Sequence, residues 1–189
     1  MKKISICCGL MTVFTVAALI SGCSIFPEPR QSSIEYYDLK PPKQLQCPPI
    51  DVEQFVTFSG ERQRMLRRKR DISVESSDFN KWMQAPGALL TRYLRLTFRN
   101  HLETPIVNRD QCAILRGEVI TFEINGKEAV LGIRYQLKYD RQTYSKTVLI
   151  KEKIEGRGPA AFAQTMSRAA ERFAQMIAVE SARITAKRK

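Results

Sequence analysis

The side chains that could carry out chemistry are few, and they exclude most classes of enzyme. His101 is the only histidine, so the chain cannot build a histidine-based metal cluster or a Ser-His-Asp triad. It contains no Gly-x-x-x-x-Gly-Lys-Ser/Thr loop, so we expect no ATP hydrolysis by the chain itself. Acidic pairs such as Glu152 and Glu155 have no neighbours in the sequence that would tune them for acid–base work. The sequence therefore predicts a protein that is not an enzyme and that has no cofactor and no metal site.

The five cysteines are the other reactive side chains, and the first of them to consider is Cys23. Lys2 and Lys3 precede an apolar run over residues 4–19, and the segment Ile20-Ser21-Gly22-Cys23 follows it. A positive start, a short apolar stretch and small residues before a cut are typical of a secretory signal. An apolar residue, two small residues and cysteine resemble the lipobox of bacterial prolipoproteins, whose thiol takes a diacylglycerol before cleavage. We expect residues 1–22 to be a lipoprotein signal peptide and Cys23 to carry acyl chains such as palmitate.

An ordinary signal peptide or a transmembrane anchor is the alternative to a lipoprotein signal. A membrane span needs about 20 apolar residues, and this run is slightly shorter and ends at a cleavage-like site. Acyl chains on one residue give stable anchoring, because each buried methylene contributes about 0.8 kcal/mol. Ser24, rather than Asp, follows the cysteine, and this favours the outer membrane over retention in the inner membrane. We expect a lipid-anchored envelope protein that faces the periplasm.

Cys47 and Cys112 remain after Cys7 and Cys8 leave with the signal. An even pair of cysteines in an oxidising compartment is compatible with a disulfide. Two unpaired thiols, one of them buried in a strand, are the other interpretation. The sequence leaves both open.

Length and charge limit the class of protein and of partner. Residues 23–189 form a mature chain of 167 residues, which suits one domain with a real core. The full chain has a formal net charge of +12, and removing Lys2 and Lys3 leaves 29 basic and 19 acidic residues, net +10. A basic surface favours an anionic neighbour, such as phospholipid headgroups, lipopolysaccharide or an acidic protein. Nucleic acid is not an expected partner outside the cytoplasm.

Two further features are candidates for a contact surface. One is a basic segment that suits phosphate or carboxylate, because arginine presents forked donors to either group. Its members are Arg62, Arg64, Arg67, Arg68, Lys69 and Arg70. A solvated hairpin is the simpler interpretation of the same residues. The other feature is Trp82, which either packs within the domain or contacts a partner.

The hydrophobic pattern predicts an α+β fold: a largely antiparallel sheet with two helices packed on one face, as a two-layer sandwich. Residues 23–33 contain Pro27 and Pro29 and are expected to be a flexible tether, and residues 34–189 a single domain. Strands are expected at 34–39, 50–58, 64–68, 72–75, 112–124, 129–139 and 143–154. Helices are expected at 86–102, opened by Pro86, and at 160–184. The hairpin of 64–75 turns at 69–71, with one or two helical turns from Glu61 as the alternative. Gly117 is a candidate β-bulge, Asn125-Gly126 is a hairpin turn, and Trp82 lies in a connection.

The order of these features resembles the ABC-type transport auxiliary lipoprotein family, over about residues 34–184. The likeness is carried by the lipobox, Tyr36-Tyr37-Asp38-Leu39, the Asn80-Lys81-Trp82 segment before a Pro-led, Leu-rich helix, and Leu115-Arg116-Gly117 in the later strand. The resemblance implies a non-enzymatic, periplasm-facing accessory subunit. Its partners would be an ABC transporter and a mammalian-cell-entry (MCE) protein that moves phospholipid or other hydrophobic substrates between membranes. The resemblance also implies self-assembly in some members.

Two other classes of function stay open at this point. One is a structural or assembly lipoprotein, such as a pilotin-like or lipopolysaccharide-assembly-like protein. The other is a lipid-binding carrier with its own cavity between a helix and the sheet.

Overall fold

The structure is a computed structural model, and it describes residues 33–58, 63–98 and 112–186. The chain divides into two compact units, Met1–Ser33 and Ile34–Lys189, and the elements below belong to the second unit. Cys23, Arg62 and His101 lie outside the described residues. In chain order the elements are β1 (Glu35–Tyr37), β2 (Ile50–Val52), β3 (Val56–Thr57), β4 (Arg64–Arg70), β5 (Ser73–Trp82), α2 (Pro86–Thr97), β6 (Ala113–Asn125), β7 (Glu128–Tyr139), β8 (Gln142–Lys153) and α3 (Gly158–Ala186).

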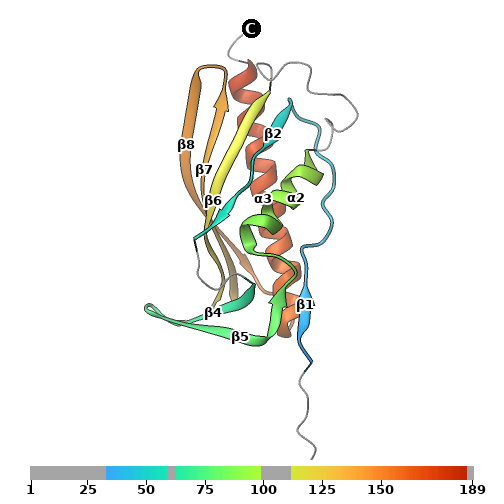
Figure 1. Ribbon diagram of the computed structural model, residues 1–189, viewed down its shortest axis with the longest axis vertical. Helices are drawn as coiled ribbons and strands as arrows, with labels where there is room; N and C mark the ends of the chain where they lie inside the picture. The colour runs from blue at the N-terminus through green and yellow to red at the C-terminus, as the bar shows by residue number, and fades with distance from the viewer. Residues whose placement is uncertain (1–32, 59–62, 99–111, 187–189) are drawn as a thin grey trace, which may run out of the picture. The chain divides into compact units, whose positions relative to one another are not determined.

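One eight-stranded sheet organises this unit, and β6 is the strand that most others meet (Figure 1). Along one edge β6 pairs with β7, and β7 pairs with β8, in the antiparallel meander that the sequence predicts. Along its other edge β6 pairs in turn with β2, β3 and β4, all in parallel. β4 and β5 form an antiparallel hairpin, and β1 adds to β5 in parallel. The β6–β7 turn has Gly126 at φ +59°, a conformation that glycine adopts without strain.

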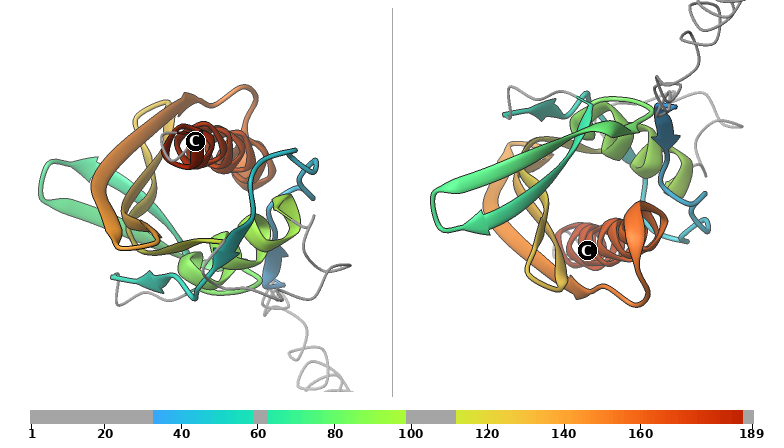
Figure 2. Two further views of the ribbon diagram at one scale, coloured as in Figure 1. Left: turned by 90° about the horizontal axis from the view of Figure 1, so that it is seen from above. Right: turned by 90° about the horizontal axis from the view of Figure 1, so that it is seen from below.

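The two helices bury their apolar stripes against the sheet. Figure 2 looks along the sheet and shows α3 inside its curve. Phe162, Met166 and Phe173 of α3 and Leu89, Leu90 and Leu94 of α2 are fully buried in one core. The fold is therefore α+β, with two helices on a mostly antiparallel sheet, as predicted. No helix among the described residues is both long enough and apolar enough to cross a membrane.

The predicted strand over residues 50–58 is instead two short strands, and Phe55 explains the break. The Phe55 N–H donates to Thr91 Oγ1 of α2 at 2.9 Å, so the chain leaves the sheet and turns the ring into the core. That ring lies over Gly117, where an added Cβ would come within 2.5 Å of it. Gly117 is therefore a site of close packing and not the bulge, which lies between Val119 and Thr121.

The basic hairpin is longer than the sequence predicts, and its turn lies at Asp71-Ile72. Residues 64–70 form a strand, so the helical alternative for this stretch is wrong. Trp82 is the last residue of β5 and pairs with Tyr37 of β1, so it does not lie in a connection. The first helix begins at Pro86 as predicted, and its described part ends at Thr97.

Candidate functional site

The described members of the basic segment all lie on β4, in the hairpin that extends from the end of the sheet (Figures 1 and 2). They are Arg64, Arg67, Arg68, Lys69 and Arg70. β4 joins the sheet only where it pairs with residues 123–125 of β6, so the turn projects beyond the core. The sequence correctly predicts that these cations share one hairpin, but they do not form one uniform surface.

Arg68 is an anchor for the hairpin and not a free cation. Its Nε and Nη2 donate to the two carboxylate oxygens of Glu123 on β6, at 2.5 and 3.0 Å. Nη1 also donates to the Asp71 carbonyl at 2.9 Å, which fixes the turn. The hydrogen bond to Glu123 raises the pKa of Arg68, which burial opposes. Because Glu123 is buried in the sheet, this forked pair holds the hairpin to the domain.

The other cations of β4 differ in how far they are neutralised. Arg64 pairs with Asp78 at 3.0 Å, and Lys69 pairs with Glu75 at 3.2 Å, across the hairpin. Both pairs are exposed to solvent, so each contributes little to stability. Arg67 and Arg70 are exposed and form no ion pair within the described residues. These two side chains keep their full charge available to an outside group.

An apolar side chain sits at the end of this basic hairpin. Ile72 is 97% exposed in the turn, and Val74 beside it is also exposed. The sequence pattern identifies Ile72 only as the start of a strand and does not indicate that it is exposed. A signal was present, because Ile72 follows Lys69-Arg70-Asp71 directly. An exposed isoleucine among cations suits a surface that is anionic outside and apolar inside, such as a phospholipid bilayer.

A small pocket lies at the base of the hairpin, between β4, β5 and the start of α3. Its volume is about 240 Å³. Arg67, Ser76 and Asn80 supply polar groups to its wall, and Met65 and Pro159 supply apolar ones. The pocket therefore combines polar and apolar groups beside Arg67.

Trp82 is a core residue, and this corrects the proposal of a direct partner contact. The side chain has no exposed surface. Its ring packs edge-to-face on Phe122, with centroids 4.9 Å apart, and on Phe162, with centroids 5.4 Å apart. The indole N–H finds no acceptor within the described residues. A partner cannot reach a side chain that is fully buried. Trp82 instead stabilises the base of the hairpin by packing on Phe122 and Phe162.

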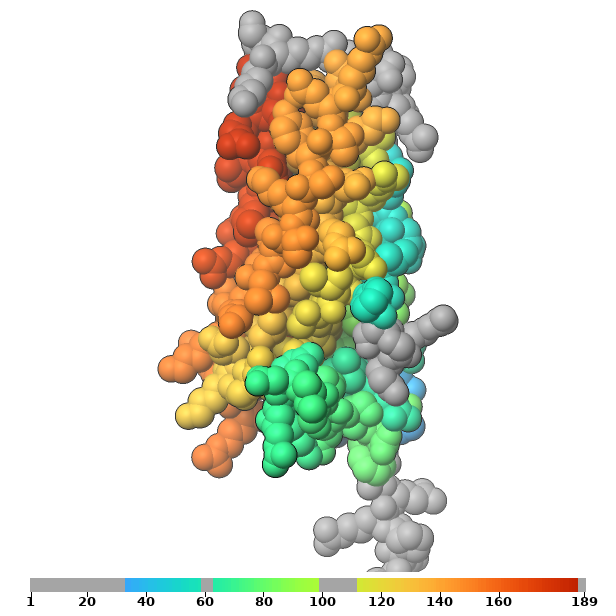
Figure 3. Space-filling model, turned by 90° about the vertical axis from the view of Figure 1, so that its left-hand side faces the viewer, coloured from blue at the N-terminus to red at the C-terminus, as the bar shows by residue number. Residues whose placement is uncertain are grey.

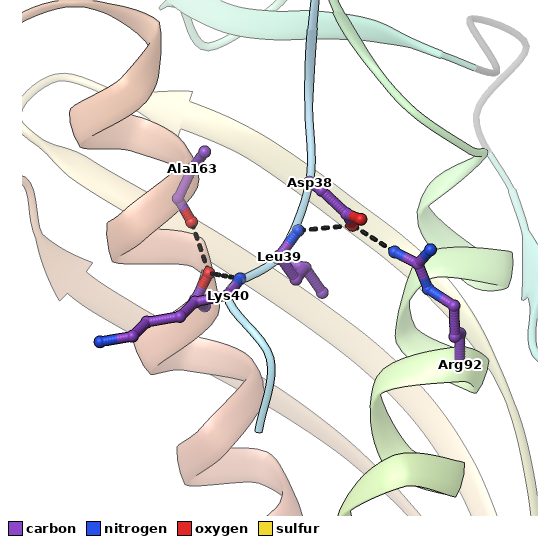
Figure 4. A network of polar contacts seen from close by, with 6 residues as sticks. Asp38, Leu39, Lys40, Arg92 and Ala163 are labelled. Atoms are coloured by element: carbon purple, nitrogen blue, oxygen red, sulfur yellow. Dashed lines mark hydrogen bonds and ion pairs between the residues drawn. The ribbon is translucent and has the colours of Figure 1, made fainter. Parts of the chain in front are cut away.

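The chain that leads into the domain is fixed at the same end as the hairpin. β1 begins at Glu35, opposite Asn80 of β5, and Figure 1 shows both at the hairpin end. After β1, Asp38 pairs with Arg92 of α2, and the Lys40 N–H donates to Ser167 Oγ of α3 at 2.9 Å (Figure 4). Ser167 Oγ in turn donates to the Ala163 carbonyl at 2.8 Å. These contacts fix residues 38–40 to both helices.

Cys47 and Cys112 are free thiols in the structure, Cys47 half-buried and Cys112 buried. Burial raises the pKa of both thiols, and Asp51 adds to the rise at Cys112. The segments that carry them are neighbours, because the Ala113 N–H donates to the Pro49 carbonyl at 2.9 Å. A bridge between them stays a prediction.

Metal-binding clusters are not found within residues 33–58, 63–98 and 112–186. No three side chains of His, Cys, Asp or Glu gather there in a way that could hold an ion. Two buried carboxylates already have partners. Glu123 pairs with Arg68. Glu180 pairs with Lys146 and accepts a hydrogen bond from Tyr135.

Comparison of the chain with known families shows which family it belongs to. The family described as ABC-type transport auxiliary lipoprotein component matches residues 37–178, three-quarters of the chain. The chain belongs to this family. The match spans the elements from the end of β1 to most of α3, so it includes the basic hairpin and both helices. Membership makes the chain an auxiliary lipoprotein component of ABC-type transport. No curated protein matches the chain.

Solved structures support the fold of this auxiliary lipoprotein. A crystal structure of an uncharacterised protein is similar, with a TM-score of 0.67 and 16% identity, over 78% of this chain and 98% of that one. The crystal structure of protein XCC0632 from Xanthomonas campestris has a TM-score of 0.63 and 13% identity, over 82% of this chain and 98% of that one. At these identities the likeness is one of fold.

Proposed function

We propose that this chain is a non-enzymatic accessory subunit of an ABC/MCE-type lipid transport system, held in a membrane by acyl chains on Cys23. In this proposal the domain faces the periplasm, and the membrane is the outer membrane. Family membership supports the role in ABC-type transport. The lipobox residues and Ser24 support the anchor and its location.

The observation that carries the membrane part of the proposal is the end of the β4–β5 hairpin. Ile72 is exposed there, with Arg70 and Lys69 beside it. The hairpin is at the end of the domain where β1 begins, and residues 23–33 span at most about 40 Å when extended. Each cation near an anionic membrane contributes about 1 kcal/mol before screening. The anchor and the hairpin would then meet the same bilayer, with Ile72 among the headgroups.

Holding the domain in one orientation is what such a contact would achieve. A flexible tether alone lets the domain rotate freely above the membrane. A second contact through Arg67, Arg70 and Ile72 would limit that rotation. The faces of the domain far from the hairpin would then point away from the membrane, where an MCE-type protein or transporter component can reach them.

Co-purification from native membranes tests the accessory role. The acylated chain is extracted with mild detergent, captured, and its partners are identified by mass spectrometry. We expect an ATPase, a permease or an MCE-type protein to be retained. If the unaltered chain retains no transport component, the accessory role is rejected.

A pair of matched variants separates a lipid contact from a protein contact at the hairpin. Lys69→Gln with Arg70→Gln removes two charges at the turn. Lys138→Gln with Arg141→Gln removes the same two residue types near the β7–β8 turn, at the other end of the sheet (Figure 1). We expect both variants to retain the transport component. Loss of that component from the hairpin variant alone, with unchanged binding of this variant to phosphatidylglycerol vesicles, would assign the hairpin to a protein partner and contradict the lipid contact.

We also propose that Cys47 and Cys112 form a disulfide in the exported protein. The neighbouring backbone bond between Ala113 and Pro49 supports this pairing. The test is alkylation of the denatured mature chain before and after reduction, followed by intact mass. A bridge leaves both thiols unlabelled until the chain is reduced, and labelling of both without reduction would contradict it.

A further inference from the structure

We propose that the free edge of β8 and the groove beside it bind an extended, acidic segment of a partner protein as an additional β-strand. This inference concerns a different face from the hairpin, and it does not rest on the transport role.

β8 is the longest unpaired edge that the described part of the sheet offers. The strand has 12 residues and is last in the strand order, and among the described residues it pairs only with β7. Alternate N–H and C=O groups of such an edge point outward, and only the Lys153 carbonyl at the end of β8 has a partner within the described residues, Arg168 Nη2 at 2.9 Å. A polypeptide in extended form can satisfy the others by adding a strand about 4.8 Å away.

α3 continues beyond this edge with apolar side chains that no strand covers. Met176 is 39% exposed and Val179 is 71% exposed, on the helix that packs against β7 and β8. Figure 3 shows α3 in red beside the orange β8 on this face. A groove of about 500 Å³ runs between them, with Tyr135 and Lys146 on the sheet side. The α3 residues of the groove recur at three and four positions and share one face: Arg172, Gln175, Met176, Val179, Glu180 and Arg183.

The charge of the groove selects an acidic occupant. Lys146, Arg172 and Arg183 stand around the apolar pair, against one acid, Glu180. Glu180 is already held, because it pairs with Lys146 and accepts a 2.6 Å hydrogen bond from Tyr135 Oη. Arg172 pairs with Glu152 at 3.0 Å, and Arg183 forms no ion pair within the described residues. The groove therefore has positive charge to spare.

These features favour a partner strand over the two other occupants of such a groove. In an added strand, side chains two residues apart face the α3 side, so alternating apolar and acidic positions would meet Met176, Val179 and the surrounding cations. A second copy of this chain would bring another strongly basic surface to the groove, because the mature chain carries a net charge of +10. An acyl chain would cover Met176 and Val179 but would leave the outward N–H groups of β8 unpaired.

The test uses a synthetic ten-residue probe, Val-Thr-Glu-Thr-Val-Thr-Glu-Thr-Val-Thr, in which Val and Glu alternate on one face of the strand, on the acylated mature chain in a nanodisc. Hydrogen exchange is measured for each β8 amide. We expect alternate amides of β8 to exchange at least tenfold more slowly with the peptide, while amides of β5 are unchanged. The same peptide with Lys in place of both Glu residues is expected to give no protection.

Two substitutions and two controls locate the binding. Val179→Ser and Arg183→Gln are each expected to weaken peptide binding at least threefold, measured by fluorescence anisotropy. Val56→Ser is the matched apolar control, because Val56 is 55% exposed but lies on β3 and not on β8. Arg67→Gln is the matched charge control, because Arg67 is exposed on β4 and forms no ion pair within the described residues. Both controls should bind like the unaltered chain.

Three results would overturn the inference. The first is no protection of β8 by the acidic peptide. The second is protection that rises with protein concentration in the absence of peptide, which would make a second copy the occupant. The third is phospholipid that displaces the peptide from the groove, which would make lipid the occupant.

Discussion

The two ends of the β4–β5 hairpin have opposite environments although they belong to the same pair of strands. At the base, Met65 and Trp82 are buried in the core, and the Trp82 ring packs on Phe122 and Phe162. At the turn, Ile72 is almost fully exposed and cations surround it. Both ends present apolar residues, but the protein itself covers only those at the base. The difference indicates that the base stabilises the fold and that the turn is available for a contact outside the chain.

Between the two ends, Arg68 joins them. Its guanidinium reaches Glu123 in the sheet and the Asp71 carbonyl in the turn. A hairpin that served only as a solvated loop would not need this attachment to a buried carboxylate. Stability and binding should therefore respond to different substitutions along the same hairpin.

Trp82→Ala at the base should have the largest effect. It leaves a cavity beside Phe122 and Phe162, and we expect a loss of about 3–5 kcal/mol in the free energy of unfolding. Urea unfolding followed by circular dichroism measures it. A loss below about 1 kcal/mol would mean that the base is not part of the core.

Arg68→Gln, in the middle of the hairpin, should cost less. It leaves the Glu123 carboxylate buried without its cation, and we expect a loss of about 2 kcal/mol because Arg68 is itself partly exposed. Lys69→Gln is the control, since the Lys69–Glu75 pair is exposed on both sides. Equal losses of unfolding free energy for the two substitutions would show that the Arg68–Glu123 pair stabilises the fold no more than the exposed Lys69–Glu75 pair does.

Ile72→Ser at the turn should leave stability within about 0.5 kcal/mol, because the side chain packs on nothing. It should still weaken binding to phosphatidylglycerol vesicles about tenfold, in a mature chain whose Cys23→Ser substitution prevents acylation. Vesicle co-sedimentation measures the binding. Val56→Ser, at another exposed apolar position, is the control and should bind normally.

The smallest expected effect is on how the free energy of unfolding depends on pH, and it comes from Glu180 of α3, in the groove beside β8. Burial raises the pKa of Glu180, but hydrogen bonds from Lys146 and Tyr135 and the nearby charge of Arg183 outweigh it, so the net pKa is lowered. A carboxyl with a lowered pKa in the folded state stabilises the fold above its unfolded pKa of about 4.3 and loses this contribution as pH falls. Glu180→Gln should therefore flatten the fall in unfolding free energy below about pH 5, measured by urea titrations from pH 6 to pH 3. An unchanged slope would show that Glu180 is not linked to folding.

Much of the fold follows from local sequence patterns. The meander of β6, β7 and β8 shows a partial alternation of apolar and polar residues and a clear Asn-Gly turn, and both helices show apolar repeats of three and four residues. The strand break at Phe55 does not follow from local pattern. It depends on Thr91 and Gly117, which are 36 and 62 positions away and which only the folded chain brings together.

The candidate site follows from the sequence only in part. The sequence pattern predicts a run of basic residues on one hairpin. It does not predict that Arg68 pairs with Glu123, which is 55 positions away. Trp82 and Ile72 are both large apolar residues near the hairpin, and their burial is decided by whether Phe122 and Phe162 lie beside them. The groove at β8 could not be predicted, because it depends on which strand ends the sheet.

Photo-crosslinking from the turn tests the central claim most directly. A photoreactive amino acid replaces Ile72 in the acylated chain in its native membrane, and the adducts are identified by mass spectrometry. The same amino acid at Leu149, which is also exposed but lies in the last strand of the sheet, is the control. We predict phospholipid adducts at position 72 and none at position 149. An absence of lipid adducts at position 72, or equal yields at both positions, would contradict the account.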